Sequence, residues 1–114
     1  MSIKAGCDIV LIKRMEEFLK NGTAEKFFSE KELSYILSKA KKEETAAGIF
    51  AAKEALGKAL GCGLSGFIIK KTEVLHKETG EPYFSFKEEF QKNISLSVSH
   101  DGDYAIAFVV IEEN

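Results

Sequence analysis

Residues 43–60 are the stretch that most constrains the fold, because they favour one long helix. The segment is rich in Ala and contains no Pro, so its helix propensity is high. Ala47, Phe50 and Glu54 are spaced by three and four residues, which places them on one face of that helix. Lys58 continues the same face. A carboxylate in line with an aromatic residue is unusual for a buried face, and a surface Glu–Lys pair worth about 0.5 kcal/mol is the ordinary alternative.

The composition predicts a single domain over residues 1–114 with a sizeable core. A chain of this length removes about two-thirds of its unfolded surface from water, and hydrophobic residues make up 45% of it. The net charge of −2 argues against a nucleic-acid binder held by a basic field. No apolar run approaches the ~18 residues of a membrane span, and the N-terminus lacks the pattern of a signal peptide.

The cysteines, Cys7 and Cys62, are too few for a disulfide framework. Free thiols are typical of reducing compartments, so we expect a cytoplasmic protein. His76 and His100 add further soft ligands, but none of the spacings among these residues is that of a zinc site.

The N-terminal strand, predicted over residues 2–12, carries an acidic residue within an apolar run. Gly6 in this strand allows another backbone to approach closely. Asp8 follows it, and a carboxylate in a largely buried strand needs a cation, a metal ion or backbone donors. The alternative is an N-cap or a charge on an edge strand.

Short helices are predicted after this strand. Residues 13–20 favour a helix that carries Arg14 near its start and ends at an Asn-Gly cap, and residues 24–28 favour a further helical turn. Ser29 and Glu32 have the spacing of a capping box, which predicts the start of the next helix. That helix should bury an apolar stripe formed by Leu33, Ile36 and Leu37.

The second half of the chain is mainly β-rich. Residues 67–75 and 83–86 flank a Gly/Pro turn and predict a hairpin, which a short helix over residues 87–92 follows. The clearest alternation of apolar and polar residues ends at His100. Residues 104–111 are almost all apolar. They predict a strand that is buried on both faces or against another subunit. Helices first and strands later, with one strand at the N-terminus, favour an α+β fold with a largely antiparallel sheet.

The residues that suggest chemistry are mainly acidic. Asp8 and Glu54 lie on faces predicted to be buried, and oxygen ligands from one or two carboxylates suit Mg²⁺, which takes further oxygens from water and phosphate. Lys58 can offer a point charge to that phosphate, and His100 can donate to a phosphate or shuttle a proton. The alternative for His100 is a core residue, because a single His at an apolar position of an alternating strand is more often part of the core. Together these residues predict a Mg²⁺-dependent site for a phosphorylated ligand.

The long helix is predicted to stop at Gly61 and Gly63, which follow it closely. Such glycines are ordinarily a helix cap. They also permit a ligand phosphate to approach the backbone, because no side chain intervenes.

Five segments, in order along the chain, form a pattern that is specific in combination. They are Gly6-Cys7-Asp8-Ile9-Val10 with Ile12 and Arg14, Phe28-Ser29 with Glu32-Leu33, Phe50-Ala51-Ala52-Lys53-Glu54-Ala55 with Lys58-Ala59-Leu60-Gly61, Gly80-Glu81-Pro82-Tyr83, and Ser97-Val98-Ser99-His100. These segments resemble motifs of the holo-[acyl-carrier-protein] synthase family, the small bacterial 4′-phosphopantetheinyl transferases. The resemblance covers nearly the whole length of the chain.

The resemblance implies a 4′-phosphopantetheinyl transferase-like fold, in which a mainly antiparallel sheet packs on a long central helix and shorter helices. It implies transfer of the phosphopantetheine arm of coenzyme A to a serine of apo acyl carrier protein, with release of adenosine 3′,5′-bisphosphate. This reaction supports fatty acid biosynthesis. The small members of the family are trimers with a site at each subunit interface, so the resemblance implies a homotrimer.

The resemblance also implies roles for individual residues. Asp8 and Glu54 match the family's Mg²⁺ ligands. Our candidate for the base that takes the serine proton is Glu54, acting directly or through a metal-bound water. Lys58 and His100 match residues that contact coenzyme A phosphates. Arg14 matches the arginine that meets the acidic helix of the carrier protein.

Two positions depart from the family pattern. Ile49 stands where the family often has Arg, and Asp101 stands where it often has Thr. Both departures concern the affinity for coenzyme A more than the reaction.

There are two rival interpretations of the sequence. One is a non-catalytic module that binds carrier protein or coenzyme A, and the other is a nucleotide-binding regulatory domain. Either protein would bind its ligand without forming a covalent product.

Overall fold

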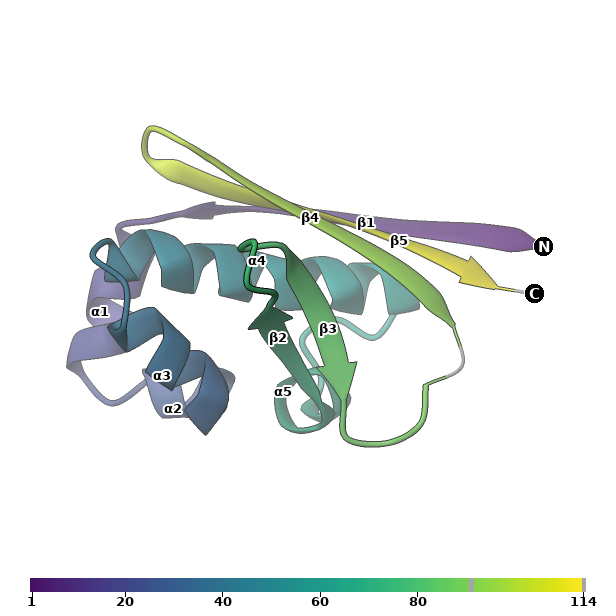
Figure 1. Ribbon diagram of the computed structural model, residues 1–114, viewed down its shortest axis with the longest axis horizontal. Helices are drawn as coiled ribbons and strands as arrows, with labels where there is room; N and C mark the ends of the chain where they lie inside the picture. The colour runs from purple at the N-terminus through teal and green to yellow at the C-terminus, as the bar shows by residue number, and fades with distance from the viewer. Residues whose placement is uncertain (91, 114) are drawn as a thin grey trace.

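The computed structural model describes residues 1–90 and 92–113, with a sheet on one side of a long helix and most other elements on the other side (Figure 1). This arrangement confirms the predicted α+β class. The elements are β1 (Ser2–Leu11), α1 (Arg14–Lys20), α2 (Ala24–Phe27), α3 (Glu30–Leu37), α4 (Lys42–Leu60), α5 (Gly66–Lys71), β2 (Thr72–His76), β3 (Pro82–Phe86), β4 (Asn93–Asp101) and β5 (Tyr104–Glu113).

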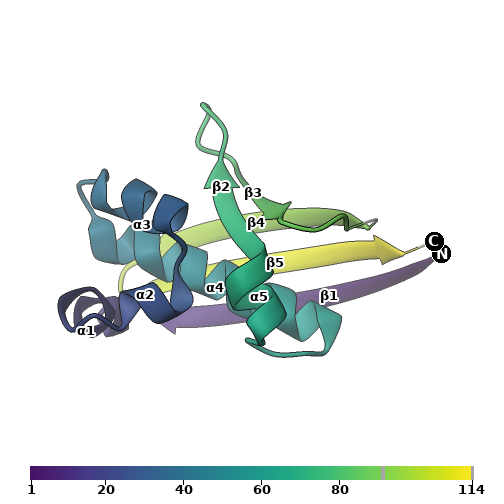
Figure 2. The ribbon, with the colours of Figure 1, turned by 90° about the horizontal axis from the view of Figure 1, so that it is seen from below.

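The larger sheet is antiparallel and has the order β1-β5-β4. A tight turn joins β4 to β5, and Gly102 in that turn has the positive φ of 58° that a glycine adopts without strain. Ser2 pairs with Glu113 at the far end of β1, so the two ends of the chain lie side by side (Figures 1 and 2). Because β5 is the central strand, β1 and β4 flank it and carry different candidate residues.

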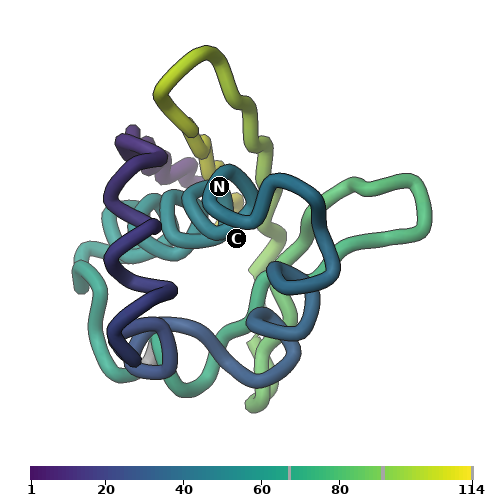
Figure 3. Tube along the Cα trace, turned by 90° about the vertical axis from the view of Figure 1, so that its left-hand side faces the viewer, coloured from purple at the N-terminus to yellow at the C-terminus, as the bar shows by residue number. Residues whose placement is uncertain are grey.

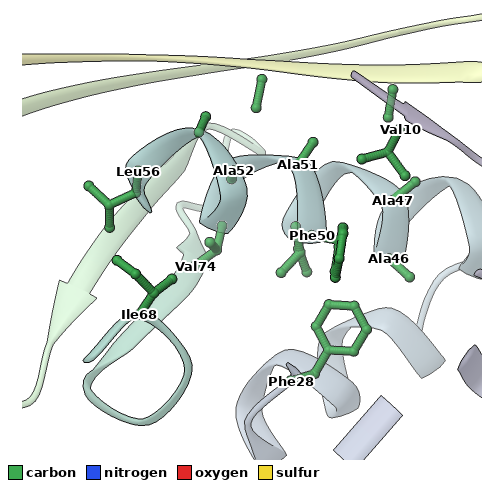
Figure 4. Packing of buried hydrophobic residues seen from close by; sticks show 14 of the residues in the cluster. Val10, Phe28, Ala46, Ala47, Phe50, Ala51, Ala52, Leu56, Ile68 and Val74 are labelled. Atoms are coloured by element: carbon green, nitrogen blue, oxygen red, sulfur yellow. The ribbon is translucent and has the colours of Figure 1, made fainter. Parts of the chain in front are cut away.

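Helix α4 lies against the inner face of this sheet, and small residues permit the contact. A Cβ atom on Gly6 would lie 2.0 Å from the carbonyl oxygen of Ala55, so β1 can approach the helix only with glycine there. This confirms the predicted close approach at Gly6. The helix presents buried alanines to the sheet and larger side chains such as Leu56 to the other elements (Figure 4). Replacement of the fully buried Leu56 by Ala should therefore cost about 2–5 kcal/mol.

Helices α1 to α3, helix α5 and the β2–β3 hairpin cover the side of α4 that faces away from the sheet (Figures 1 and 2). Helix α3 begins with the predicted capping box: Ser29 Oγ accepts from the Glu32 N–H at 3.1 Å, and Glu32 Oε1 accepts from the Ser29 N–H at 2.9 Å. The capping box thus fixes the start of a helix that packs against the centre of the fold.

Figure 3 shows the β2–β3 turn and the β4–β5 turn projecting from different sides of the molecule.

Two predicted elements differ in the structure. Residues 66–71 form helix α5 instead of the start of a strand. Ile68 of this helix is buried in the core, and a short apolar run does not distinguish strand from helix. Residues 87–90 are not helical: Lys87 N–H donates to the Lys71 carbonyl at 2.9 Å, and Phe90 stacks on Phe86. The predicted helix over 87–92 is therefore wrong within the described residues.

Three burial predictions also need correction. Leu37, the last residue of α3, is 59% exposed, because Ile36 takes the core position beside it. Strand β1 is an edge strand with mostly exposed side chains and is not largely buried. Strand β5 alternates: Ala105 and Ala107 are buried under α4, whereas the intervening side chains lie exposed on the outer face. Burial of both faces of β5 within one chain is therefore wrong, whereas burial of its outer face against another subunit stays a prediction.

Candidate active site

Asp8 of β1 and Lys58 of α4 meet where the strand approaches the helix. Asp8 lies two residues beyond Gly6 and therefore points to the same face of the sheet. Lys58 Nζ lies 3.0 Å from Asp8 Oδ1 and donates a second hydrogen bond to the Cys7 carbonyl oxygen at 3.0 Å. The Asp8 side chain is 16% exposed and that of Lys58 is 52% exposed. Of the partners predicted for Asp8, the structure provides a cation, Lys58. The Asp8 carboxylate also remains partly accessible to water.

Glu54 lies one helical turn before Lys58 and is half-buried. Burial raises the pKa of the Glu54 carboxyl, and the negative charge of Asp8 raises it further. The positive charges of Lys58 and Arg14 lower the same pKa but do not cancel the rise. These charge interactions place Asp8, Glu54, Lys58 and Arg14 in one cluster, in which Glu54 is a better proton acceptor than an ordinary glutamate.

The same contacts affect Lys58. Its hydrogen bond to Asp8 raises the pKa of the Lys58 ammonium, and the charges of Asp8 and Glu54 act in the same direction. Lys58 is therefore firmly cationic at neutral pH. A cation with an exposed side chain beside two carboxylates can bind a phosphate that enters from solvent.

Arg14 opens helix α1 and lies over an aromatic cluster. The centre of its guanidinium group is 5.5 Å from the Phe50 ring centroid and 6.0 Å from that of Phe18. Phe50 precedes Glu54 by one turn, so Arg14 stands beside the acidic cluster and is itself exposed. Its position therefore combines access from solvent with proximity to the candidate reacting groups.

The glycines after α4 form a helix cap. Gly61 adopts the left-handed conformation with φ of 75°, and its N–H donates to the Lys58 carbonyl at 3.2 Å. The N–H groups of Cys62 and Gly63 both donate to the Gly57 carbonyl, at 3.0 and 3.1 Å. These N–H donors are occupied. A phosphate at Gly61 or Gly63 would therefore approach the backbone because glycine has no side chain, and not because free N–H groups are available.

His100 lies apart from this cluster, near the other end of α4. Its Nε2 is 3.1 Å from the Glu44 carbonyl oxygen, and its Nδ1 is 3.8 Å from Glu44 Oε1. A Cβ on Gly48 would approach Nε2 to 3.0 Å, so His100 packs on the helix at that residue. The helix rises about 15 Å between Gly48 and Lys58. The fold therefore brings Asp8, Glu54, Lys58 and Arg14 together but does not add His100 of the same chain.

A pocket of about 180 Å³ opens beside His100. It lies between α3, the start of α4, the β2–β3 hairpin and β4. Its lining residues are Tyr35, Thr45, Gly48, Ile49, Val74, His76, Gly80, Pro82, Val98 and His100. Ile49, one of the departures from the family pattern, is 2% exposed and forms part of its apolar wall. The pocket thus includes Gly80 and Pro82 of the turn noted in the sequence, together with His76, which the sequence suggested only as a possible soft metal ligand.

A buried ion pair beside the cluster escaped the sequence reasoning. Lys53 Nζ lies 2.6 Å from Glu32 Oε1, and both side chains are almost inaccessible to water. Lys53 also donates to the Phe27 carbonyl at 3.0 Å, and Glu32 Oε2 accepts from the Val74 N–H at 2.8 Å. A lysine three residues after Phe50, on a face of buried alanines, was the available signal, because a buried lysine needs a carboxylate.

The described residues contain no cluster of three or more His, Cys, Asp or Glu side chains able to hold a metal ion, and none of their helices is long and apolar enough to cross a membrane. A protein contribution of two carboxylates nevertheless fits Mg²⁺, which keeps several waters and binds substrate phosphates. The raised pKa of Glu54 next to Asp8 also fits, because two neighbouring carboxylates favour an added cation.

Comparison with known proteins gives a consistent result. Residues 4–109 match the family model described as the 4′-phosphopantetheinyl transferase superfamily. A holo-[acyl-carrier-protein] synthase of Fusobacterium nucleatum is 37% identical over 121 residues, which cover 97% of this chain and 99% of that protein. One of Clostridium botulinum is 39% identical over 116 residues, with 94% of each chain covered.

Solved structures agree with this match. A holo-(acyl-carrier-protein) synthase of Bacillus anthracis in complex with CoA (3′,5′-ADP) has a TM-score of 0.86 and 31% identity, and the alignment covers 97% of this chain and 96% of that one. The enzyme of Helicobacter pylori in complex with coenzyme A has a TM-score of 0.82 and 32% identity, with coverage of 95% and 99%. Both chains are similar over nearly their whole length.

Proposed function

The chain belongs to the 4′-phosphopantetheinyl transferase superfamily, and on that premise we propose that it catalyses the reaction of the holo-[acyl-carrier-protein] synthases. It transfers the 4′-phosphopantetheine arm of coenzyme A to a serine of apo acyl carrier protein and releases adenosine 3′,5′-bisphosphate. The observation that carries this proposal is the cluster of Asp8, Glu54 and Lys58, which lies open to solvent on one flank of α4. The two free thiols fit a cytoplasmic location.

The reaction is an in-line displacement at phosphorus. The serine oxygen of the carrier protein forms a bond to the phosphorus that bears the pantetheine arm, and the bond from that phosphorus to the bridging oxygen breaks. The leaving group keeps that oxygen and its electrons. Lys58 stabilises negative charge that develops on the phosphate oxygens, because it is cationic and its ammonium group is accessible.

Glu54 is the proposed base. Burial and the charge of Asp8 raise its pKa, so its carboxylate takes the serine proton more readily than an ordinary glutamate does. Asp8 and Glu54 would hold a Mg²⁺ ion, which supplies charge stabilisation to the phosphate oxygens when bound. Removing either carboxylate should therefore lower the rate without unfolding the protein.

The nucleotide end of coenzyme A is proposed to bind in the pocket beside His100. The pocket offers apolar walls for a base, and His100 at its edge can contact a phosphate. The pocket and the acidic cluster of one chain lie near different ends of α4, so one coenzyme A molecule would use the cluster of one copy and His100 of a second copy. Asp101, next to His100, is exposed and places a negative charge near that phosphate.

The outer face of the sheet supports such an assembly. Cross-strand rows on this face join Ile9 to Ile106 and Leu11 to Tyr104, with exposures between 38% and 60%. Phe108, at 48% exposure, continues the patch. Large exposed apolar patches of this kind mark protein interfaces. We therefore propose a closed homotrimer, and a stable monomer in native mass spectrometry at micromolar concentration would contradict it.

Arg14 is proposed to contact the acyl carrier protein. Its guanidinium group is exposed beside the acidic cluster, where the carrier's serine must arrive. The planar fork of Arg suits a carboxylate of an acidic partner. This contact would hold the carrier protein with its serine facing Glu54.

Mass spectrometry of the carrier protein tests the proposed function. Apo acyl carrier protein is incubated with this protein, coenzyme A and Mg²⁺, and we expect a mass gain of one phosphopantetheine. The Glu54→Gln variant, which keeps the shape of the side chain, is the matched control and should give a far slower gain. Binding of coenzyme A without any covalent product would contradict the proposal and favour a non-catalytic binding module.

A further inference from the structure

The Glu32 carboxylate joins three elements of the fold. Its Oε1 accepts from the Ser29 N–H at 2.9 Å and lies 2.6 Å from Lys53 Nζ of α4. Its Oε2 accepts from the Val74 N–H of β2 at 2.8 Å. The Glu32 side chain is fully buried. Both carboxylate oxygens therefore have fixed partners, and one of them is committed to β2.

Strand β2 depends on this contact because it belongs to a small sheet. Among the described residues, β2 pairs with β3 alone. The N–H groups along a strand of an antiparallel pair alternate between the partner strand and the opposite edge. The Val74 N–H lies on the edge away from β3, where Glu32 Oε2 takes the place of a further strand. The adjacent residue, Glu73, accepts from Ser29 Oγ at 2.6 Å, so two neighbouring residues of β2 are tied to the start of α3.

The position of β2 decides the shape of the pocket beside His100. The Val74 side chain packs in the core against α4 and also lines that pocket (Figure 4). Gly80 and Pro82, which follow β2 in the chain, line the pocket from the turn of the hairpin. The pocket therefore keeps its shape only while the β2–β3 hairpin stays docked on α3 and α4.

We propose that Glu32 is a positioning residue for donor binding, because its carboxylate holds the β2–β3 hairpin where the donor requires it. This proposal rests on the proposed function, in which the donor is coenzyme A. Glu32 touches no substrate and acts through the Val74 N–H. Lys53 neutralises the charge of Glu32, and its other polar partner is the Phe27 carbonyl, so it stabilises the fold without holding the hairpin.

An undocked hairpin would weaken donor binding without changing the chemical step. When only the docked form binds the donor, the apparent dissociation constant rises as the docked fraction falls. Loss of one buried hydrogen bond changes such an equilibrium by roughly 5- to 30-fold. Once the donor is bound the hairpin is docked, so the rate of transfer from the complex stays the same. The expected signature is a raised KM for coenzyme A at an unchanged kcat.

Hydrogen exchange of the Val74 amide tests the contact in the wild-type protein without any substrate. This amide should exchange as slowly as the core amides of α4, because its N–H is bonded only while the hairpin is docked. A Val74 amide that exchanges as fast as one in an exposed turn would overturn the proposal without any variant.

The Lys53→Met variant is the control for stability. It removes the cation but leaves both Glu32 oxygens with their N–H donors. A buried carboxylate without its cation should lower the melting temperature. The KM for coenzyme A should nevertheless stay within about twofold of the wild type, because the hairpin keeps its acceptor.

The double variant Glu32→Leu, Lys53→Met removes the ion pair together with the acceptor of the Val74 N–H. It should melt at a higher temperature than Lys53→Met, because no charge stays buried alone. Its KM for coenzyme A should be roughly 5- to 30-fold above that of the wild type, with kcat within about twofold. Its Val74 amide should exchange at least about tenfold faster than in the wild type. A KM that followed the melting temperature, and was therefore highest in Lys53→Met, would show a structural role only and overturn the proposal.

Calorimetry with coenzyme A distinguishes this proposal from the proposed function. If the double variant bound coenzyme A more weakly than Lys53→Met but the wild type transferred nothing to acyl carrier protein, the transferase function would fail and the role of Glu32 would stand. If the wild type transferred the phosphopantetheine arm and the two variants bound coenzyme A equally tightly, the function would stand and the role of Glu32 would fail.

Discussion

Helix α4 carries two lysine–carboxylate pairs that differ most in burial. Lys53 and Glu32 are 2.6 Å apart, with side chains 1% and 0% exposed. Lys58 and Asp8 are 3.0 Å apart, with side chains 52% and 16% exposed. The same two chemical groups thus occur within five positions of one helix, once in the core and once at the edge.

Burial decides what each pair can do. The inner pair is surrounded by fixed partners, because Glu32 accepts from the Ser29 and Val74 N–H groups and Lys53 donates to the Phe27 carbonyl. These partners cannot be exchanged for water, so the pair joins α3 and β2 to α4. The outer pair faces solvent, and water or a phosphate can replace either contact at little cost. The inner pair therefore contributes to the stability of the fold, whereas the outer pair remains available for a ligand.

Removal of Lys53 should have the largest effect. Lys53→Ala leaves the Glu32 carboxylate buried without its cation, which should lower the free energy of unfolding by about 3–5 kcal/mol. Lys58→Ala is the matched control and should change stability by less than about 1 kcal/mol. Urea unfolding of the two variants measures both values. Similar losses for the two lysines would show that burial does not separate the pairs.

Substitutions in the outer cluster should lower the rate of phosphopantetheine transfer strongly while they leave the stability of the protein nearly unchanged. Glu54→Gln and Asp8→Ala should each lower the transfer rate by roughly 100- to 1,000-fold, because charge stabilisation at the phosphate is lost. Their unfolding curves should stay close to that of the wild type. A chelator should inhibit the wild type, and added Mg²⁺ should restore it. Near-normal turnover by a folded Glu54→Gln variant would remove this carboxylate from the mechanism.

Substitution of Arg14 tests the exposed cluster as a contact for the carrier protein. Arg14→Glu should weaken carrier-protein binding by about 1–3 kcal/mol, seen as a higher KM for carrier protein at an unchanged KM for coenzyme A. Salt should narrow the difference from the wild type, since exposed charges are screened over about 8–10 Å. Lys13→Glu makes the same charge change at the adjacent exposed residue and should have a smaller effect. A wild-type KM for Arg14→Glu at low salt would leave Arg14 as a solvated surface charge.

The smallest effect concerns the pH dependence of stability. The pKa of Glu54 in the folded protein lies above its ordinary value of 4.5, so the folded state binds a proton more strongly than the unfolded state. This contribution to stability is fully present below pH 4.5 and is lost as the pH rises through the folded-state pKa. Glu54→Gln should remove it, so the stability difference between variant and wild type should change across that window. A constant difference over the same pH range would contradict the raised pKa.

Several features of the fold were predictable because they depend on local sequence. The capping box of Ser29 and Glu32, the helical pattern of α4 and the small residue at Gly6 each act through near neighbours or sterics. Helix α5 was not predictable, because the apolar run around Ile68 fits strand and helix equally well.

The candidate site was predictable in its residues but not in its geometry. The spacing of Glu54 and Lys58 on one helix places them together, and Asp8 joins them through the close approach of β1. The separation of His100 from this cluster depends on how α4 crosses the sheet, which no local pattern encodes. The partner of Lys53 likewise comes from a distant segment, so only the fold reveals the buried pair.

In the proposed trimer, transfer takes place where the Asp8 cluster of one copy meets His100 of another. Asp8→Ala and His100→Ala variants, each strongly impaired alone, can be mixed after dissociation and reassembled. In an equimolar random mixture, about a quarter of all interfaces, counted over mixed and unmixed trimers together, combine an intact Asp8 with an intact His100, so about a quarter of the wild-type rate should return. Mixed trimers confirmed by native mass spectrometry that stay as inactive as the separate variants would contradict a site shared between copies.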